Sequence, residues 1–260
     1  MNKNTTPTQI LGIDIGGSGI KSAPVDTARG RLLEKPEYVA ITNATTPDET
    51  RSIIQKIIAK YAPAIPVGIG YPGVIKNGMV RSAANVSPDW LDKNLAEFFR
   101  PLTSGAVRVL NDADAAGLAE MKFGAGKDYD HPGGGTVLLL TLGTGIGSAL
   151  FYRGQLFPNT EFGHVFLKNG REGESIAAAS VRVRENLTWT DWAVRLNYFL
   201  KEMEKLFTPD LIILGGGIVE NFERFRTHLK TGAEIRPAET GNDAGLIGAA
   251  YYTSLMLVAQ

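Results

Sequence analysis

The sequence predicts an α/β protein built from two similar domains, and two observations lead to this prediction. A buried strand, a glycine-rich turn and a returning strand occur near the start of the chain, and the same unit occurs again roughly 130 residues later. Each copy is followed by a stretch in which helical and strand-like patterns alternate. The chain has 260 residues, which is enough for a core in each of two domains of moderate size.

The first copy begins at residue 10. Residues 10–15 have the apolar side chains of a buried strand, and residues 20–25 are expected to pair back on it. The glycines of the run 16–19 suit a turn with positive φ. The second copy, residues 140–149, matches residues 13–23 once one residue is dropped from the tip of the first copy. Two copies of one unit indicate two similar domains that face a shared phosphate.

The tip of the first hairpin has groups suited to a phosphate and a metal ion. Its backbone N–H groups and the side chains of Ser18 and Lys21 can surround an anion, while the carboxylate of Asp14 faces a divalent cation. An ordinary glycine-rich hairpin is the alternative. A Walker loop is excluded because Ile20 separates Gly19 from Lys21, and a dinucleotide fingerprint is excluded because the second glycine run leads into a strand-like stretch.

The rest of the first half alternates between strands and helices. A third strand is predicted at residues 31–41. Thr46-Pro-Asp-Glu49 then predicts the start of a helix, because it combines a capping threonine, a proline in the first turn and a glutamate three residues after the threonine. The remaining predicted elements are a short strand running into a turn at 67–74, a helix at 91–102 and a strand at 107–110. The order β-β-β-α-β-α-β is that of one actin-like, ribonuclease-H-like domain.

The second half runs the same way. After the second hairpin we predict a loop at 158–173, a long helix at 188–207, a strand at 210–214, a helix at 218–228 and a last apolar helix at 243–258. We therefore expect a small N-terminal actin-like domain (1–112) and a larger C-terminal one (113–242), with an active-site cleft between them. Residues 243–260 are expected to pack back on the N-terminal domain.

The composition excludes several classes of function. Lys and Arg together number 27, as do Asp and Glu, so no global basic field favours nucleic acid or an anionic membrane. The absence of cysteine excludes disulfides and thiolate zinc sites, and no apolar run is long enough for a membrane span. Residues 1–9 are polar and lack an apolar signal core, so we expect a frayed tail on a cytoplasmic protein.

Asn111 and Asp112 directly follow a predicted strand, at the position where open α/β sheets place ligands. There the carboxylate of Asp112 can take the proton from a substrate hydroxyl while a phosphoryl group arrives. The alternative is that Asp112 or Asp114 only caps a helix at residues 113–123. Asp114 suits the capping role at least as well, which leaves Asp112 as the candidate catalytic base.

A second polar group lies in the predicted loop. Glu161 and His164 can hold neighbouring sugar hydroxyls by directional hydrogen bonds, although a solvated loop is the alternative there and for Glu174. A zinc site is not favoured, because the three histidines are scattered and no cysteine accompanies them. Gly215-Gly-Gly217, before a predicted helix, can let a base or phosphate approach the backbone, or can be only a tight turn.

Together these motifs resemble the ROK sugar kinases over residues 10–255. The resemblance is carried by Asp14-Ile-Gly-Gly-Ser-Gly-Ile-Lys21, Gly70-Tyr-Pro-Gly73, Asn111-Asp112, Leu142-Gly-Thr-Gly-Ile-Gly147, Glu161-Phe-Gly-His164 and Leu214-Gly-Gly-Gly217. It implies that Asp112 is the general base and that a hexose is held by Asn85, Asn111, Glu161, His164 and Glu174. It also implies that Mg²⁺ meets Asp14, and that phosphates or a nucleotide meet Gly16, Gly17, Ser18, Gly19, Lys21, Thr141, Gly143, Thr144, Gly145, Gly215, Gly216 and Gly217.

One departure from the family pattern is informative. Most ROK kinases carry a cysteine-rich zinc motif just after the Glu-x-Gly-His element, and this chain has no cysteine. This feature and the stretch 187–192 resemble the polyphosphate glucokinase branch, which does without the zinc. The resemblance implies a zinc-free, magnesium-dependent homodimer that acts in glycolysis.

The resemblance therefore implies a glucokinase that moves a phosphoryl group from inorganic polyphosphate, and also from ATP, to the 6-hydroxyl of glucose or of mannose. A strictly ATP-dependent hexokinase stays open, and so does a non-catalytic sugar sensor, although only nine polar residues precede Ile10 where a repressor would need a DNA-binding element. A long polyanion would need a cationic track, for which the candidates are Lys21, Arg81, Arg153, Lys168, Arg171, Arg182 and Arg184.

Overall fold

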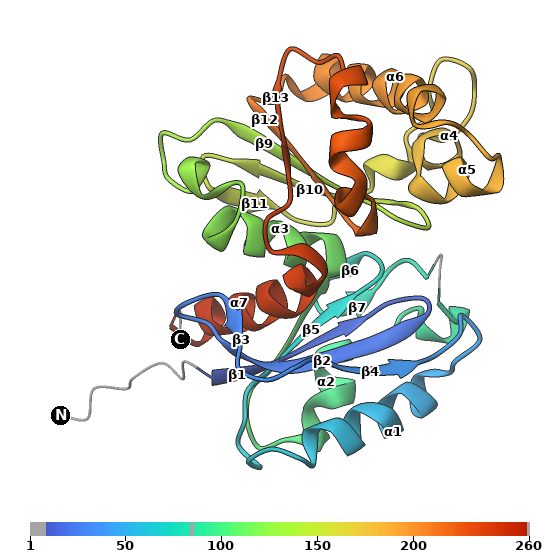
Figure 1. Ribbon diagram of the computed structural model, residues 1–260. Helices are drawn as coiled ribbons and strands as arrows, with labels where there is room; N and C mark the ends of the chain where they lie inside the picture. The colour runs from blue at the N-terminus through green and yellow to red at the C-terminus, as the bar shows by residue number, and fades with distance from the viewer. Residues whose placement is uncertain (1–8, 84–85, 259–260) are drawn as a thin grey trace. The chain divides into compact units, whose positions relative to one another are not determined.

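The computed structural model describes residues 9–83 and 86–258. The chain divides into two compact units, which are described one by one (Figure 1). Of the described residues, the first unit contains those up to Ala119 together with those from Asp243 onward, and the second contains Glu120–Asn242. Within the described residues, no helix is both long and apolar enough to cross a membrane.

The first unit is organised on a sheet with the strand order β3-β2-β1-β5-β8, in which β4 also pairs with β2. The bounds are β1 Gln9–Ile15, β2 Gly19–Asp26, β3 Arg31–Leu32, β4 Glu37–Ala40, β5 Val67–Tyr71 and β8 Val107–Asn111. Strands β1 and β2 are antiparallel, so the predicted first hairpin is confirmed, whereas β1, β5 and β8 are mutually parallel. A separate small hairpin joins β6 (Ile75–Lys76) to β7 (Met79–Val80).

The helices of the first unit follow from local sequence signals. Helix α1 (Pro47–Ile58) begins at Thr46, whose hydroxyl accepts from the Glu49 N–H while the Glu49 carboxylate accepts from the Thr46 N–H, so the predicted capping box is confirmed. Helix α7 (Ala244–Val258) packs on β1 and β5. Gly12 and Gly68 permit this packing, because a Cβ at either position would collide with the α7 backbone.

The second unit has a sheet with the strand order β11-β10-β9-β12-β13. Its strands are β9 Thr136–Leu142, β10 Ile146–Tyr152, β11 Gln155–Phe157, β12 Leu211–Gly215 and β13 Glu234–Pro237. Antiparallel β9 and β10 form the predicted second hairpin, and β12 is parallel to β9. The core lies between this sheet and the helices α4 (Glu174–Ala177), α5 (Ala179–Arg184) and α6 (Trp189–Phe207).

Four sequence predictions differ from the structure in detail. The strand expected at 31–41 is split into β3 and β4 around Pro36, which has no N–H to donate. The helix expected at 91–102 is only α2 (Leu95–Phe99) followed by a 3₁₀ turn, Arg100–Leu102, since Asp92 has φ 60° and Pro101 follows. The helix expected at 218–228 is two 3₁₀ segments, Gly217–Arg224 and Arg226–His228, broken at Phe225, where φ is −131°.

The fourth difference concerns the glycine run at the first hairpin tip. The expectation of positive φ is wrong there, because none of Gly16, Gly17 and Gly19, all of them described, lies in the left-handed region. Glycine at position 19 serves a different purpose: it leaves room for the ring of Tyr38, which a Cβ there would overlap. That ring lies across the turn, and its hydroxyl donates to the carbonyl of Ser18 at 2.8 Å.

Candidate active site

The first unit brings several of the predicted residues to the carboxyl ends of its parallel strands. Asp14 lies near the end of β1 opposite Gly70 of β5, and Asn111 ends β8 opposite Tyr71. A Cβ on Gly70 would lie 3.5 Å from Asp14 Oδ1 and 3.6 Å from the Cα of Asp112. The two predicted acidic residues are therefore neighbours across one glycine, at the edge where such sheets bind ligands.

Asn111, and neither aspartate, is the side chain that caps the following helix. Helix α3 (Asp112–Phe123) begins directly after β8, and the amide oxygen of Asn111 accepts from the N–H of Asp114 at 3.0 Å. The amide nitrogen of Asn111 donates to the carbonyl of Gly73 at 3.1 Å, so both ends of this buried side chain are held. The expected capping role of Asp114 is therefore wrong.

Asp112 is the first residue of α3 and is half-buried. Its Oδ1 accepts from the N–H of Ala113 at 2.7 Å, which fixes the carboxylate at the start of the helix. The positive end of the helix dipole favours a negative charge at this position. A carboxylate held in this way can accept a proton without first changing its rotamer.

The environment of Asp14 disfavours a lone negative charge. Burial raises the pKa of Asp14 above its ordinary value, and the charge of Lys21, its cross-strand neighbour, offsets only part of that effect. Gly245 of α7 packs against the carboxylate, because a Cβ there would lie 2.8 Å from Asp14 Cγ. A divalent cation would reverse the balance by stabilising the ionised form.

The tip of the first hairpin is a closed turn. The N–H of Gly16 donates to the carbonyl of Gly19 at 2.9 Å, and the carbonyl of Ser18 also accepts from the N–H of Ile41 at 3.1 Å. The side chain of Ser18 is exposed at the outer end of the turn, next to the half-buried Gly17. Asn85, the remaining predicted residue of this half, lies outside the described residues.

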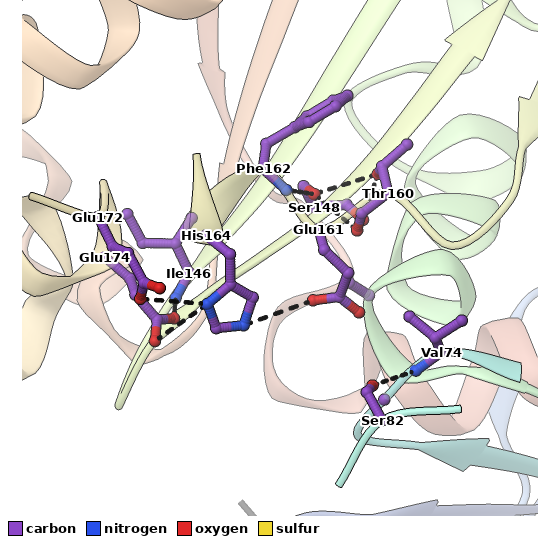
Figure 2. Close-up of polar contacts among 12 residues, drawn as sticks. Val74, Ser82, Ile146, Ser148, Thr160, Glu161, Phe162, His164, Glu172 and Glu174 are labelled. Carbon is purple, nitrogen blue, oxygen red and sulfur yellow. Dashed lines mark hydrogen bonds and ion pairs between the residues drawn. The ribbon is translucent and has the colours of Figure 1, made fainter. Parts of the chain in front are cut away.

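The second unit positions Glu161 and His164 through a buried hydroxyl pair beneath the loop (Figure 2). Ser148 Oγ lies 3.1 Å from Thr160 Oγ1 and accepts from the N–H of Phe162 at 3.0 Å, while Thr160 Oγ1 donates to the carbonyl of Ser148 at 2.8 Å. Because strand β10 supplies Ser148, the loop that carries Glu161 is fixed to the sheet on both sides of this residue. A single 3₁₀ turn, Phe162–His164, then presents His164.

The imidazole of His164 faces three carboxylates, as Figure 2 shows. Nδ1 lies 3.3 Å from Glu172 Oε2 and 3.9 Å from Glu174 Oε1, and Nε2 lies 4.0 Å from Glu161 Oε2. His164, Glu172 and Glu174 each place one possible ligand atom within 4.8 Å of the others. The structure thus brings together the predicted residues Glu161, His164 and Glu174. It adds Glu172, which was not predicted.

The surroundings of Glu161 shift the pKa of its carboxyl group. Burial raises its pKa, the charge of Glu174 raises it further, and His164 partly opposes the shift. Such a carboxylate gains from any hydrogen-bond donor that enters beside it, because a new donor replaces the water it has lost.

Glu174 also supports the second glycine-rich tip. Its Oε2 accepts from the N–H of Ile146 at 3.1 Å, and a Cβ on Gly145 would collide with the same oxygen. On the other side of the tip, the carbonyl of Gly143 accepts from the N–H of Ser180 at 3.0 Å. The tip is therefore fixed between α4 and α5, and Thr141 leads into it from the end of β9, opposite Gly215.

A pocket of about 500 Å³ opens next to this tip. Its lining includes Gly143, Thr144 and Gly217 from the predicted phosphate motifs, together with Trp189, Arg182 and Arg224. Gly216 has φ 83°, and a Cβ there would lie 2.7 Å from the carbonyl of Leu142, so this turn packs directly on the end of β9.

Two guanidinium groups lie over the indole ring of Trp189, Arg182 at 3.7 Å and Arg224 at 5.4 Å from its centroid. The buried Nε of Arg182 and the buried Nε1 of Trp189 have no hydrogen-bond partner among the described residues. Of the two arginines, sequence reasoning proposed only Arg182. Arg224 sits among other surface charges, and nothing in its spacing marks it.

Comparison with known proteins shows the family that the chain matches. Residues 10–179 match the ROK family. A polyphosphate glucokinase of Mycobacterium tuberculosis is 40% identical over 247 residues, which cover 95% of this chain and 91% of that protein. The structure of an inorganic polyphosphate/ATP-glucomannokinase from Arthrobacter sp. strain KM superimposes with a TM-score of 0.89 at 39% identity, over 96% of this chain and 100% of the other. A glucokinase of Thermotoga maritima is 34% identical over 169 residues, 62% of this chain and 51% of its own length.

Proposed function

The chain belongs to the ROK family, and from this we propose that it is a glucokinase that transfers a phosphoryl group from inorganic polyphosphate, and also from ATP, to the 6-hydroxyl of glucose. The observation that carries the proposal is its likeness, along nearly the whole chain, to polyphosphate glucokinases and to a polyphosphate/ATP-glucomannokinase. Mannose is the second hexose that we expect it to accept. We further propose that the two units are two actin-like domains and that the enzyme acts in glycolysis, in the cytoplasm, as a homodimer.

Asp112 is the proposed general base. As the glucose O6 attacks the terminal phosphorus of the donor, the O6–H proton passes to Asp112, and the bond from phosphorus to the departing phosphate oxygen breaks. The hydrogen bond from the Ala113 N–H supports this role, because it orients one carboxylate oxygen. The neighbouring Asn111 is already held at both ends, so we assign it first to positioning Asp112, with the hexose as a further partner.

Glu161, His164 and Glu174 are the proposed partners of the sugar hydroxyls. Two acceptors lie 4.0 Å apart, His164 Nε2 and Glu161 Oε2, and this spacing suits two adjacent hydroxyls, each donating to one of them. The raised pKa of Glu161 is supporting evidence, since a buried carboxylate gains from a donor that the sugar brings.

Asp14 is the proposed contact for Mg²⁺. The fit rests on its oxygen donors and on the burial that disfavours its lone charge, both of which a hard divalent cation would relieve. When bound, Mg²⁺ neutralises charge on the transferred phosphoryl group. We expect no zinc, since the chain has no cysteine for the zinc motif that most of the family carries.

The pocket beside Trp189 is the proposed donor site. Its two cations, Arg182 and Arg224, favour phosphate oxygens. These residues support a phosphate chain, of polyphosphate or of ATP, held by Arg182, Arg224 and the tip at Gly143–Thr144.

Initial rates with polyphosphate and with ATP test this assignment. We expect Arg182→Ala and Arg224→Ala each to raise the KM for polyphosphate by about tenfold, while Arg100→Ala, an exposed control, changes nothing. The KM for polyphosphate should rise more steeply with salt than the KM for ATP, because more ion pairs are screened. Robust turnover with ATP beside none with polyphosphate at low salt would leave an ATP-dependent hexokinase.

A further inference from the structure

The two ring nitrogens of His164 face different carboxylates, and only one of these contacts is short. Nδ1 lies 3.3 Å from Glu172 Oε2, whereas Glu174 Oε1 is 3.9 Å away and the second oxygen of Glu174 is engaged with the N–H of Ile146. Nε2 faces Glu161 at 4.0 Å, a gap that leaves room for a ligand atom. Glu172 is thus the one described acid within hydrogen-bond distance of this ring.

The backbone around Glu172 is tied in place although its side chain is 38% exposed. Residues 166 and 172 form an isolated antiparallel bridge, and the N–H of Leu167 donates to the carbonyl of Arg171 at 2.9 Å. Gly170, with φ 74°, closes this turn, and Ser175 Oγ donates to the carbonyl of Glu172 at 2.8 Å. The turn therefore presents the Glu172 carboxylate to His164 from a fixed backbone.

We propose that Glu172 is a positioning residue that selects the tautomer and orientation of His164 for hexose binding. The proposal rests on the proposed function, since it concerns the same sugar site. An ionised carboxylate only accepts hydrogen bonds, so in this contact Nδ1 must carry the proton. In the neutral ring Nε2 is then an acceptor, directed into the gap beside Glu161, where it can receive a hydrogen bond from a sugar hydroxyl.

Removal of the Glu172 carboxylate frees the ring to exchange tautomers and to rotate. We expect Glu172→Ala to raise the KM and Kd for glucose by about tenfold while kcat and the donor KM change by less than about twofold. Glu172→Gln keeps an acceptor oxygen for Nδ1–H, so it should restore affinity to within about threefold of the unmodified enzyme. Glu97→Ala, at an exposed glutamate of α2, is the matched control and should alter neither constant.

A double-mutant cycle separates positioning from other roles. His164→Ala removes the ring through which Glu172 acts, so adding Glu172→Ala to it should raise the glucose Kd no further. Equal additional weakening in the His164→Ala background would overturn the proposal, since Glu172 would then act on the sugar directly. A fall in Tm with Glu172→Ala that fully accounts for the lost affinity, without rescue by Gln, would overturn it in favour of a structural role.

The nitrogen chemical shifts of the imidazole test the proposal without any turnover. The chain has three histidines, so the ¹⁵N signals of His164 can be assigned by their loss in His164→Ala. We expect a protonated Nδ1 and an unprotonated Nε2 in the unmodified protein, and a mixed or reversed pattern in Glu172→Ala. A predominant Nε2–H form in the unmodified protein would refute the inference. Failure of the proposed function would instead appear as absence of glucose binding with the Nδ1–H pattern intact.

Discussion

The buried carboxylate of Glu120 gives the sharpest test of what stabilises the second unit. Its side chain is fully buried in α3 and accepts four hydrogen bonds, from the N–H groups of Ala125, Glu239 and Thr240 and from the hydroxyl of Thr240. One side chain therefore joins the end of α3 to the segment that follows β13. We expect Glu120→Ala to leave these four donors without the carboxylate that accepts from them.

The magnitude follows from the number of donors. An unsatisfied buried donor costs about 1–3 kcal/mol, and the lower limit applies here because Glu239 is exposed and Thr240 is half-exposed. Four donors at about 1 kcal/mol each predict a loss of about 4 kcal/mol, which corresponds to a fall in Tm of about 8–16 °C for a chain of this size.

Thermal unfolding followed by calorimetry measures this loss, with Glu97→Ala as the exposed control. Glu120→Gln should be intermediate, because its amide keeps one acceptor oxygen but directs an NH₂ group at donors. A fall in Tm below about 2 °C for Glu120→Ala would refute the reasoning, since it would mean that the four donors find other partners at little cost.

Three further predictions concern the site. Burial raises the pKa of Glu161, so ionisation of its carboxyl group at neutral pH opposes folding. This destabilisation is absent below the ordinary pKa and develops as pH rises through the raised pKa. Glu161→Gln should therefore raise Tm at pH 7–8, by a difference that shrinks toward pH 4, while glucose binding measured by calorimetry weakens. Gly145→Ala should lower kcat and raise the donor KM, both read from initial rates, because the new Cβ would displace the Glu174 carboxylate. Gly170→Ser is the control: its side chain has space, but the backbone there has φ 74°, so this variant should lower Tm with little change in donor KM. Treatment with EDTA followed by Mg²⁺ alone should restore full turnover, and elemental analysis that finds one tightly bound zinc per chain would contradict the zinc-free assignment.

Much of the fold was predictable because its signals are local. The capping box at Thr46, the apolar strand 10–15 and its copy at the second hairpin each depend on residues close together in the sequence, and the structure confirms them. The long helix expected at 188–207 is α6, which begins after Thr188, whose side chain accepts from the N–H of Asp191. Membership of the ROK family, inferred from the order of the motifs, is also confirmed.

The details that sequence reasoning missed depend on contacts between distant residues. Gly19 leaves room for the ring of Tyr38, and Tyr38 of β4 pairs with Lys21 of β2. The spacing of the glycines in the sequence does not reveal this packing. Asn111 caps α3 because its side chain also reaches Gly73, a contact over 38 residues. Glu172 looked like one acid among several in a polar loop until the turn at Gly170 placed it beside His164.

The product formed from polyphosphate and glucose tests the central proposal most directly. Glucose, polyphosphate, Mg²⁺ and the enzyme at low salt, followed by ³¹P and ¹³C nuclear magnetic resonance, should give glucose phosphorylated at O6 with matching loss of terminal polyphosphate. Asp112→Asn should bind glucose with a Kd within about threefold of the unmodified enzyme while kcat falls by about 10³-fold, because the amide keeps the shape and loses the basicity. No phosphorylated glucose with the unmodified enzyme, or near-normal kcat with Asp112→Asn, would contradict the account.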